Sequence, residues 1–296
     1  MYAKAAGLRT VYIDAQRTGG ALHNAMTEEE RALIDTFVQF DEVPVVDRDM
    51  AAADRLVQEL AETEPALILV NKVGAHFPVH DKFPDEYMTY RPVLPRGDWT
   101  EVSDTGSREG FDGSEGSWAL YRNSYRNALA WNVGAFFERL LERADLSAAV
   151  LIYTADHGQD LRSGGGSGLT THCSPSPSGV EGAVPLLTLS ADPRWQVPEA
   201  ALGEGSHYRI VPTLLQLMGY EAGAVEARYG PSLISTVDEP DTFNARFNAR
   251  LGQSPDWRSI GEDFANPVAY DSGVIPDPTK TARRDRNPDA PLDNGS

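Results

Sequence analysis

Short apolar runs alternate with longer amphipathic segments along most of the chain. The apolar runs predict β-strands at residues 8–14, 66–74, 149–155 and 184–190. The run 66–74 (ALILVNKVG) is apolar almost without interruption, which is typical of a strand that is buried on both faces. The amphipathic segments predict helices at residues 26–40, 47–63, 118–145 and 206–220.

Residues that favour helix ends support these assignments. Thr27, with Glu30 three residues later, has the pattern of a capping box. Pro65 ends the second helix, and Ser206 is placed to cap the last one. The longest helical pattern, 118–145, puts six apolar residues on one stripe: Leu129, Val133, Phe136, Phe137, Leu140 and Leu141.

Strands that alternate with helices predict an α/β fold of three layers, α/β/α, with a mostly parallel sheet in the middle. Residues 77–118 are rich in Pro, Gly and charge, so we expect a long loop that covers part of the molecule. Periodicity fades after about residue 229. We therefore expect one domain over residues 1–235, then an irregular C-terminal extension, 236–296, whose polar, Pro-rich end is disordered.

Composition excludes several classes of protein. The chain has 296 residues, 41% of them hydrophobic, which is enough for a sizeable core. A formal net charge of −18 leaves no basic surplus for phosphate backbones and argues against nucleic-acid binding. The single cysteine, Cys173, excludes an internal disulfide. No apolar run reaches the length of about 20 residues that spans a bilayer, and no signal segment is recognisable.

The strand predicted at 149–155 runs directly into Asp156, His157 and Gly158. In parallel sheets, binding sites lie at the carboxyl ends of the strands. A carboxylate and an imidazole side by side suit zinc or manganese, and Gly158 would let the backbone turn so that both side chains face one point. The alternative is an ordinary turn in which Asp156 is a cap and His157 is exposed.

Other polar residues near the predicted strand ends offer further chemistry. His76 follows the strand 66–74, although it could equally be a loop histidine bonded to the backbone. His172 lies in a loop of small residues and could simply be solvated, while Cys173 beside it has no assigned partner. His207 is expected in the first turn of a helix. Lys72 could contact an anion, or be half buried by its stem.

In this order, the segments resemble the later part of a sulfatase-like catalytic domain of the alkaline phosphatase superfamily, most nearly the phosphoethanolamine transferases of bacterial envelopes. Those enzymes carry Gly-Ser-His-Gly-Pro where this chain has Gly74–Pro78, and Ser-Asp-His-Gly where it has Ala155–Gly158. The resemblance covers roughly residues 1–235 and implies an alkaline-phosphatase-like fold. It rests on these four segments, taken in order: 67–78, 121–161, 184–190 and 206–220.

The resemblance also implies roles for single residues. Asp156 and His157 match the metal ligands of the family, with zinc favoured among divalent metals. His76 and His172 match histidines that hold the transferred phosphoryl group or a second metal, and so rank as catalytic. His207 matches a helix-start position and is expected to be structural. The expected function is metal-dependent phosphoryl transfer or hydrolysis, of the phosphoethanolamine type to an envelope acceptor, on an anionic phosphate or sulfate ester.

One departure from the family pattern bears on activity. The segment 2–16 (YAKAAGLRTVYIDAQ) resembles the stretch directly after the family's nucleophile, so the nucleophile and an upstream acidic ligand are expected to precede Met1. Family members are periplasmic or membrane-associated, and many carry transmembrane helices ahead of this domain. Two alternatives stay open: a sulfate-ester hydrolase on the same scaffold, and a non-catalytic remnant or binding domain.

Overall fold

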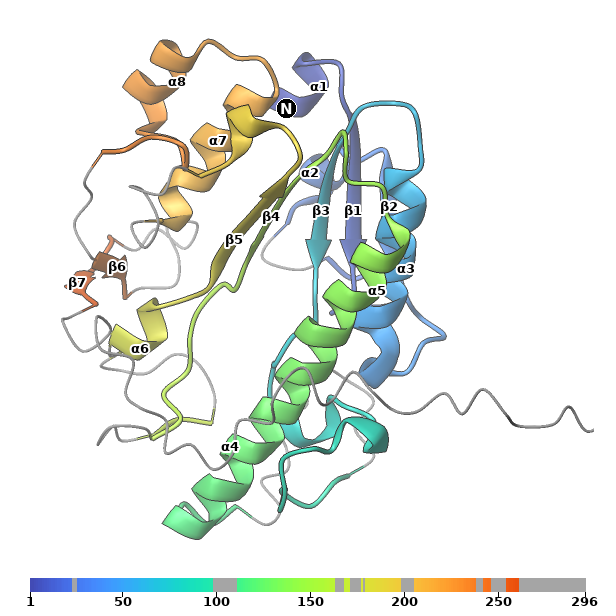
Figure 1. Cartoon of the computed structure of the whole chain (residues 1–296), viewed down its shortest axis with the longest axis vertical. Helices are drawn as coiled ribbons and strands as arrows, with labels where there is room; N and C mark the ends of the chain where they lie inside the picture. The colour runs from blue at the N-terminus through green and yellow to red at the C-terminus, as the bar shows by residue number, and fades with distance from the viewer. Residues whose placement is uncertain are drawn as a thin grey trace, which may run out of the picture. The chain divides into compact units, whose positions relative to one another are not determined.

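Three parallel strands form the first sheet, in the order β2 (Thr36–Gln39), β1 (Arg9–Asp14), β3 (Ala66–Asn71). In this computed structural model Thr10 pairs with Leu67 and Tyr12 with Leu69. The strands predicted at 8–14 and 66–74 are confirmed, as is the α/β class. The carboxyl ends of all three strands lie at one edge of the sheet (Figure 1).

The structure describes residues 1–22, 26–97, 111–162, 168–170, 177, 179–197, 205–237, 242–245 and 254–260, all of which fall in a single unit, Met1–Ile260. The division expected at residue 235 and the irregular extension 236–296 stay predictions.

One face of this sheet is covered by two helices, α3 (Arg48–Leu60) and α5 (Phe136–Arg143). The helices are joined by Arg139, whose guanidinium donates to both carboxylate oxygens of Asp54 at 2.6 and 2.9 Å. Between helices and sheet lies the main apolar core. Its buried members are Val11, Ile13, Ala15, Val45, Met50, Ala52, Ala53, Leu56, Val73, Ala135, Phe136 and Leu140.

The helix predicted at 118–145 is confirmed as a composite of α4 (Glu115–Leu129), a π-helical segment (Ala130–Ala135) and α5. The π-helical segment adds a residue to the helical turn and so shifts which side chains face the core. Phe136 and Leu140 are buried, but Leu129 and Leu141, expected on the same stripe, are exposed. The expectation of one continuous stripe is therefore wrong at its two ends.

A second pair of strands, β4 (Val150–Thr154) and β5 (Leu186–Ser190), confirms the other two predicted strands. They pair antiparallel, which departs from the mostly parallel arrangement expected. Within the described residues, neither β4 nor β5 is hydrogen-bonded to the three-stranded sheet. β4 runs in the same direction as β3 (Figure 1).

The helix predicted at 26–40 is wrong beyond its first turn. The capping box forms, since Thr27 Oγ1 accepts from Glu30 N at 3.2 Å and Glu30 Oε2 accepts from Thr27 N at 3.0 Å. However, α2 (Glu28–Arg31) is a single turn and the chain then enters β2. Pairing with β1 outweighs helical periodicity here, because Phe37 stacks on the ring of Tyr12 with centroids 5.5 Å apart.

The helix predicted at 206–220 is a 3₁₀ turn, His207–Arg209, followed by α7 (Ile210–Leu217). Ser206 caps it as expected, because its side chain accepts from Tyr208 N. The pattern did not predict α8 (Ala222–Tyr229) or the antiparallel pair β6 (Thr242–Asn244) and β7 (Trp257–Ser259). The remaining short elements are α1 (Tyr2–Ala5), α6 (Gly179–Gly182) and 3₁₀ turns at Val45–Asp47, Val79–Asp81, Asp85–Tyr87 and Pro193–Trp195.

Much of the described part of the expected covering loop packs against α4. Its buried residues Val79, Phe83 and Leu94 form a second apolar cluster with Trp118, Tyr121 and Ala128. Among the helices that the structure describes, none combines the length and the apolar character needed to cross a bilayer.

Candidate functional site

Asp156 and His157 follow the carboxyl end of β4, as the sequence predicted. Asp156 Oδ2 lies 3.8 Å from His157 Nε2, and the carboxylate is 82% exposed while the imidazole is 38% exposed. His157 Nδ1 lies 2.7 Å from the carbonyl of Gly158. This hydrogen bond puts the ring proton on Nδ1, so Nε2, on the side of Asp156, carries the lone pair through which a histidine binds metal.

Gly158 is required for close packing. A Cβ at this position would stand 2.1 Å from the carbonyl oxygen of Val180 and 2.8 Å from that of Ala183. Gly158 N also donates to Glu181 O at 2.8 Å, so the turn after β4 rests directly on the backbone of α6. The φ of Gly158 is outside the left-handed region, and its missing side chain makes room for α6. The expectation that Gly158 lets Asp156 and His157 face one point stays a prediction.

His207 contacts the same strand end, although its place in the sequence suggested only a structural role. Its Nε2 lies 2.8 Å from Thr154 Oγ1, and that hydroxyl lies 2.8 Å from the carbonyl of Pro185, to which it donates. Burial lowers the pKa of His207, while the backbone of Ala155 and the charge of Asp156 act in the opposite direction. The signal in the sequence was weak, namely a histidine directly after the helix cap.

The neighbouring residue points elsewhere. Tyr208 belongs to the same 3₁₀ turn as His207, but its ring contacts Trp257 in β7, with centroids 5.0 Å apart. Both residues are more than half exposed. This turn therefore links the end of β4 to the C-terminal strand pair.

His76 follows the carboxyl end of β3. Its Nδ1 lies 2.7 Å from the carbonyl of Phe77, the same contact to the next residue that His157 makes. Its ring stacks on Phe77 with centroids 4.4 Å apart. Gly74 in this turn has φ +59°, a left-handed conformation that glycine adopts readily.

A buried carboxylate holds the turn that carries His76. Asp49, at the start of α3, accepts from Val73 N at 2.7 Å and from Gly74 N at 2.9 Å. Lys72 Nζ lies 3.4 Å from Asp49 Oδ2 and 3.2 Å from the centre of the Phe136 ring. Burial lowers the pKa of Lys72 to about 8 against the opposing charge of Asp49. The ammonium itself is enclosed, so the expectation of a half-buried stem is wrong.

The carboxyl end of β1 carries a further buried acid that sequence inspection did not single out. Asp14 accepts from Asn71 Nδ2 at 2.9 Å and from Gln39 Nε2 at 3.0 Å, which ties the ends of all three strands together. It also accepts from the backbone N–H groups of Gln16 and Arg17. Because each of these donors is an amide, this carboxylate fixes the edge of the sheet through neutral hydrogen bonds.

One expected site residue, His172, cannot be placed relative to the others. His172 and Cys173 lie outside the described residues. Across the residues that the structure does describe, no three His, Cys, Asp or Glu side chains gather as a metal site. The convergence of His76 and His172 with Asp156 and His157 stays a prediction.

Comparison with known proteins gives the fold a family. Residues 3–220 match the model of the family described as Sulfatase. The C-terminal periplasmic domain of EcEptC from Escherichia coli aligns with 80% of this chain and 65% of its own length, at 17% identity and a TM-score of 0.58. A zinc complex of that domain aligns with 82% of this chain and 66% of its own length, at 16% identity and a TM-score of 0.51.

The soluble domain of lipooligosaccharide phosphoethanolamine transferase A from Neisseria meningitidis also aligns, over 63% of this chain and 52% of its own, at 14% identity and a TM-score of 0.41. No curated protein matches the chain by sequence. The chain thus spans slightly less than two thirds of the EcEptC domain in the first comparison. The match to the Sulfatase family model covers most of this chain, so the chain belongs to the sulfatase family. Its fold is alkaline-phosphatase-like, as the motifs predicted.

Proposed function

We propose that this domain belongs to a metal-dependent phosphoryl-group transferase or hydrolase. The reaction would be of the phosphoethanolamine type, with an envelope component as acceptor. The observation that carries the proposal is the end of β4, where Asp156 and His157 are presented together at the carboxyl edge. A periplasmic location accords with the similar E. coli domain, which is itself periplasmic.

The residues at the end of β4 suit zinc. A zinc-binding histidine usually donates its second ring N–H to a carbonyl or carboxylate, and His157 does so to Gly158. A carboxylate oxygen on the Nε2 side, 3.8 Å away, is within the span of two ligands on one ion. A catalytic zinc normally has three protein ligands and an open position, so at least one further ligand is required.

Each residue has a proposed role. Bound zinc would lower the pKa of a nucleophile and stabilise negative charge on an ester oxygen. Asp156 and His157 would hold the ion. His76, held by the Asp49 turn, and His172 would donate protons to phosphoryl oxygens or to the leaving alkoxide.

Zinc titration of the full chain tests this function. Isothermal titration of the metal-free protein should give one zinc site, and Asp156→Ala or His157→Ala should each weaken it by at least tenfold. Asp145→Ala is a matched control, because Asp145 is an acid that precedes the same strand and accepts from Ser147 N. Equal affinity in all four proteins would refute the metal site and favour a binding domain.

The ester class is tested separately. In the zinc-bound full-length gene product, p-nitrophenyl phosphate should be cleaved faster than p-nitrophenyl sulfate. The reverse preference would support the sulfate-ester alternative on the same site. His76→Ala should lower kcat while leaving zinc affinity unchanged, because His76 is proposed to contact the ester.

A further inference from the structure

Arg17 is unlike the other arginines in the part of the chain that the structure describes, because its guanidinium contacts no other group. Each of the others lies against a carboxylate, a carbonyl oxygen or an aromatic ring, as Arg139 does against Asp54. Arg17 is half-buried, yet among the described residues only its backbone N–H has a partner, namely Asp14. The chain has 44 acidic residues against 26 lysines and arginines, so a guanidinium without a carboxylate is unexpected.

The loop that carries Arg17 begins at the carboxyl end of β1 and is fixed there by side chains. Asp14 Oδ1 accepts from the backbone N–H groups of Gln16 and Arg17, at 3.0 and 3.3 Å. Gln16 Nε2 donates to the carbonyl of Lys72 at 2.7 Å, which ties the loop to the end of β3. The backbone of Arg17 is therefore held beside the turn that leads from β3 to His76.

Two glycines continue this loop and are held by residues at and just beyond the end of β2. Gly19 and Gly20 have φ +64° and +75°, left-handed conformations that glycine adopts readily. Gly19 N donates to Asp41 Oδ1 and Gly20 N to Gln39 Oε1, both at 2.8 Å. Because the loop is fixed at both ends, little backbone ordering is required when one of its side chains binds a ligand.

Two acids take part in the hydrogen bonds of this loop, and neither pairs with the side chain of Arg17. Asp14 accepts from four N–H groups, and Asp41 accepts from Gly19 N. The hydroxyl of Thr18, which is also half-buried, has no hydrogen bond with any residue in the described ranges. The loop therefore presents two adjacent side chains whose hydrogen-bond donors the described protein does not use.

The order of the strands places Arg17 beyond His76. β1 lies on the side of β3 away from β4 (Figure 1). Along the carboxyl edge, the turn with Asp156 and His157 is thus followed by His76 after β3 and by Arg17 after β1. Paired strands are about 4.8 Å apart, so the Arg17 loop is the direct neighbour of the His76 turn. A substrate that reacts between the β4 and β3 turns needs to extend only one strand further to reach Arg17.

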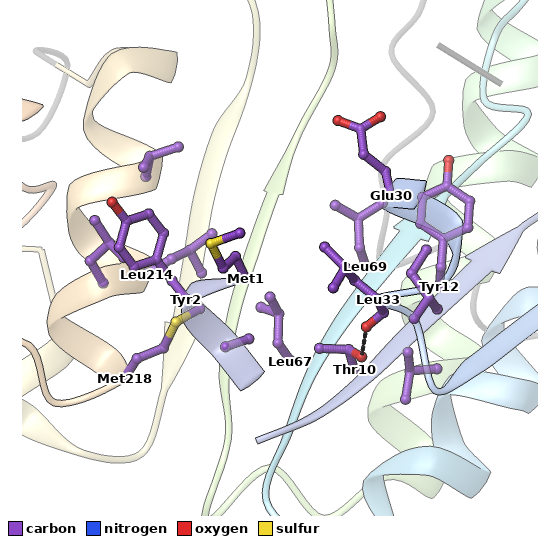
Figure 2. Close-up of a pocket in the computed structure, with 15 residues that line it drawn as sticks. Met1, Tyr2, Thr10, Tyr12, Glu30, Leu33, Leu67, Leu69, Leu214 and Met218 are labelled. Carbon is purple, nitrogen blue, oxygen red and sulfur yellow. Dashed lines mark hydrogen bonds between the residues drawn. The ribbon is translucent and has the colours of Figure 1, made fainter. Parts of the chain in front are cut away.

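The pocket between the sheet and α7 is not suited to an anionic ligand (Figure 2). It has a volume of about 380 Å³, and most of its lining side chains are apolar, such as Leu69 of β3 and Leu214 of α7. Among the residues that line it, the one charged side chain is that of Glu30, an acid. An anion would be repelled there, whereas the carboxyl edge offers it the guanidinium of Arg17.

We propose that Arg17 binds a phosphate group of the substrate, one other than the ester that reacts between the β3 and β4 turns. A guanidinium presents a planar fork of N–H donors that fits two phosphate oxygens at once, and the Thr18 hydroxyl is a further donor. The identity of the substrate rests on the proposed function, whereas phosphate binding by Arg17 requires no metal. Because the bound phosphate does not react, the contact strengthens substrate and transition-state binding equally and lowers KM without raising kcat.

Inorganic phosphate tests the contact in the metal-free chain. The ¹⁵N-labelled full chain, in EDTA and at constant ionic strength, should show saturable NMR shifts of the Arg17 Nε–Hε signal and of the backbone N–H signals of residues 16–20. In Arg17→Ala these backbone shifts should be at least fivefold smaller. Arg31→Ala is the matched control, because it removes the same charge from an arginine that lies against the Phe37 ring. The absence of saturable shifts in the wild type, or equal shifts in wild type and Arg17→Ala, would overturn the proposal.

A pair of sugar phosphates tests the substrate class. In the zinc-bound full-length gene product, release of inorganic phosphate should show a KM at least tenfold lower for fructose 1,6-bisphosphate than for fructose 6-phosphate. Arg17→Ala should remove most of that difference and leave kcat within about twofold, and Arg17→Lys should restore part of it. An unchanged KM ratio in Arg17→Ala would overturn the proposal while the proposed function stands. If neither sugar releases phosphate, the proposed function fails, and the phosphate titration decides on Arg17.

Discussion

The turns after β3 and β4 present a histidine in the same way but are supported differently. In each, the imidazole Nδ1 lies 2.7 Å from the next carbonyl. The β3 turn is built around Asp49, which is fully buried, whereas the acid of the β4 turn, Asp156, is largely exposed. One turn uses its charged groups to fix the backbone, and the other offers its acid to solvent. The same local motif is therefore tied into the fold at one strand end and left open to solvent at the next, where we propose that it binds a metal ion.

The largest difference between the two turns is expected when Asp49 and Asp156 are each replaced by alanine and the free energy of unfolding is measured. Asp49→Ala leaves Lys72 buried without its counter-charge and two backbone N–H groups without an acceptor. We expect the free energy of unfolding to fall by about 3–5 kcal/mol. Asp156→Ala should change it by no more than about 0.5 kcal/mol. Urea denaturation measures both, and similar losses would contradict the contrast.

The buried Lys72 beside the β3 turn should make the free energy of unfolding depend on pH. Its pKa is about 8 in the folded chain against 10.5 as the ordinary value. Between these values the unfolded chain binds more protons, so stability rises with pH and is lost as pH falls toward 8. From pH 8 to 10 the wild type should gain about 1.4 kcal/mol per unit relative to Lys72→Met. A constant difference over that range would show that the ammonium is not enclosed.

Gly158 and Gly74 are needed in the two turns for different reasons, the first for close packing and the second for its backbone conformation. At Gly158 a side chain meets the backbone of α6, so Gly158→Ala should cost about 1–3 kcal/mol and shift the turn. At Gly74 no atom lies within 4 Å of an added Cβ, and only the positive φ matters. Gly74→Asn should therefore cost less than about 1 kcal/mol, since asparagine tolerates that conformation. Thermal unfolding of both variants gives the ranking, and the reverse order would be evidence against it.

The last prediction concerns His207 and is measured as zinc affinity. If its contact with Thr154 steadies the end of β4, His207→Ala should weaken zinc binding by about tenfold, and His207→Gln should restore part of the loss. Tyr208→Ala is the control, because that side chain leaves the same turn toward Trp257. Zinc affinity by isothermal titration, with unfolding measured in parallel, distinguishes positioning from general destabilisation.

Periodicity predicted most elements, and its failures have local causes. The capping box at Thr27 forms but starts one helical turn only, because the residues of β2 pair with β1 instead. In the long helix, the π-helical segment moves the phase, so that Leu141 turns to solvent while Leu140 is enclosed. The pairing of β2 with β1 cannot be read from the local pattern. It joins residues that are 25 positions apart in the sequence, as Val11 and Thr36 are.

The candidate site was predictable where a strand and the proposed ligands that follow it are contiguous in sequence. Asp156 and His157 could be found because both follow a recognisable strand. Asp49 could not, since it belongs to a helix and meets the β3 turn from 24 residues away. His207 was noted, but its contact with Thr154 spans 53 positions and depends on how α7 packs. Groups that support a site from another element carry no signature of their own.

The contact between Tyr208 and Trp257 offers an intrinsic optical probe. Tyr208 adjoins His207, and the indole of Trp257 lies against its ring in partial contact with solvent. Indole emission responds to small changes in polarity and neighbouring groups, so a displacement of the 207–209 turn on ligation at β4 would register as a change in intensity or wavelength. Occupancy of the β4 end can thus be followed by fluorescence without any attached dye, with Trp257→Phe as the blank.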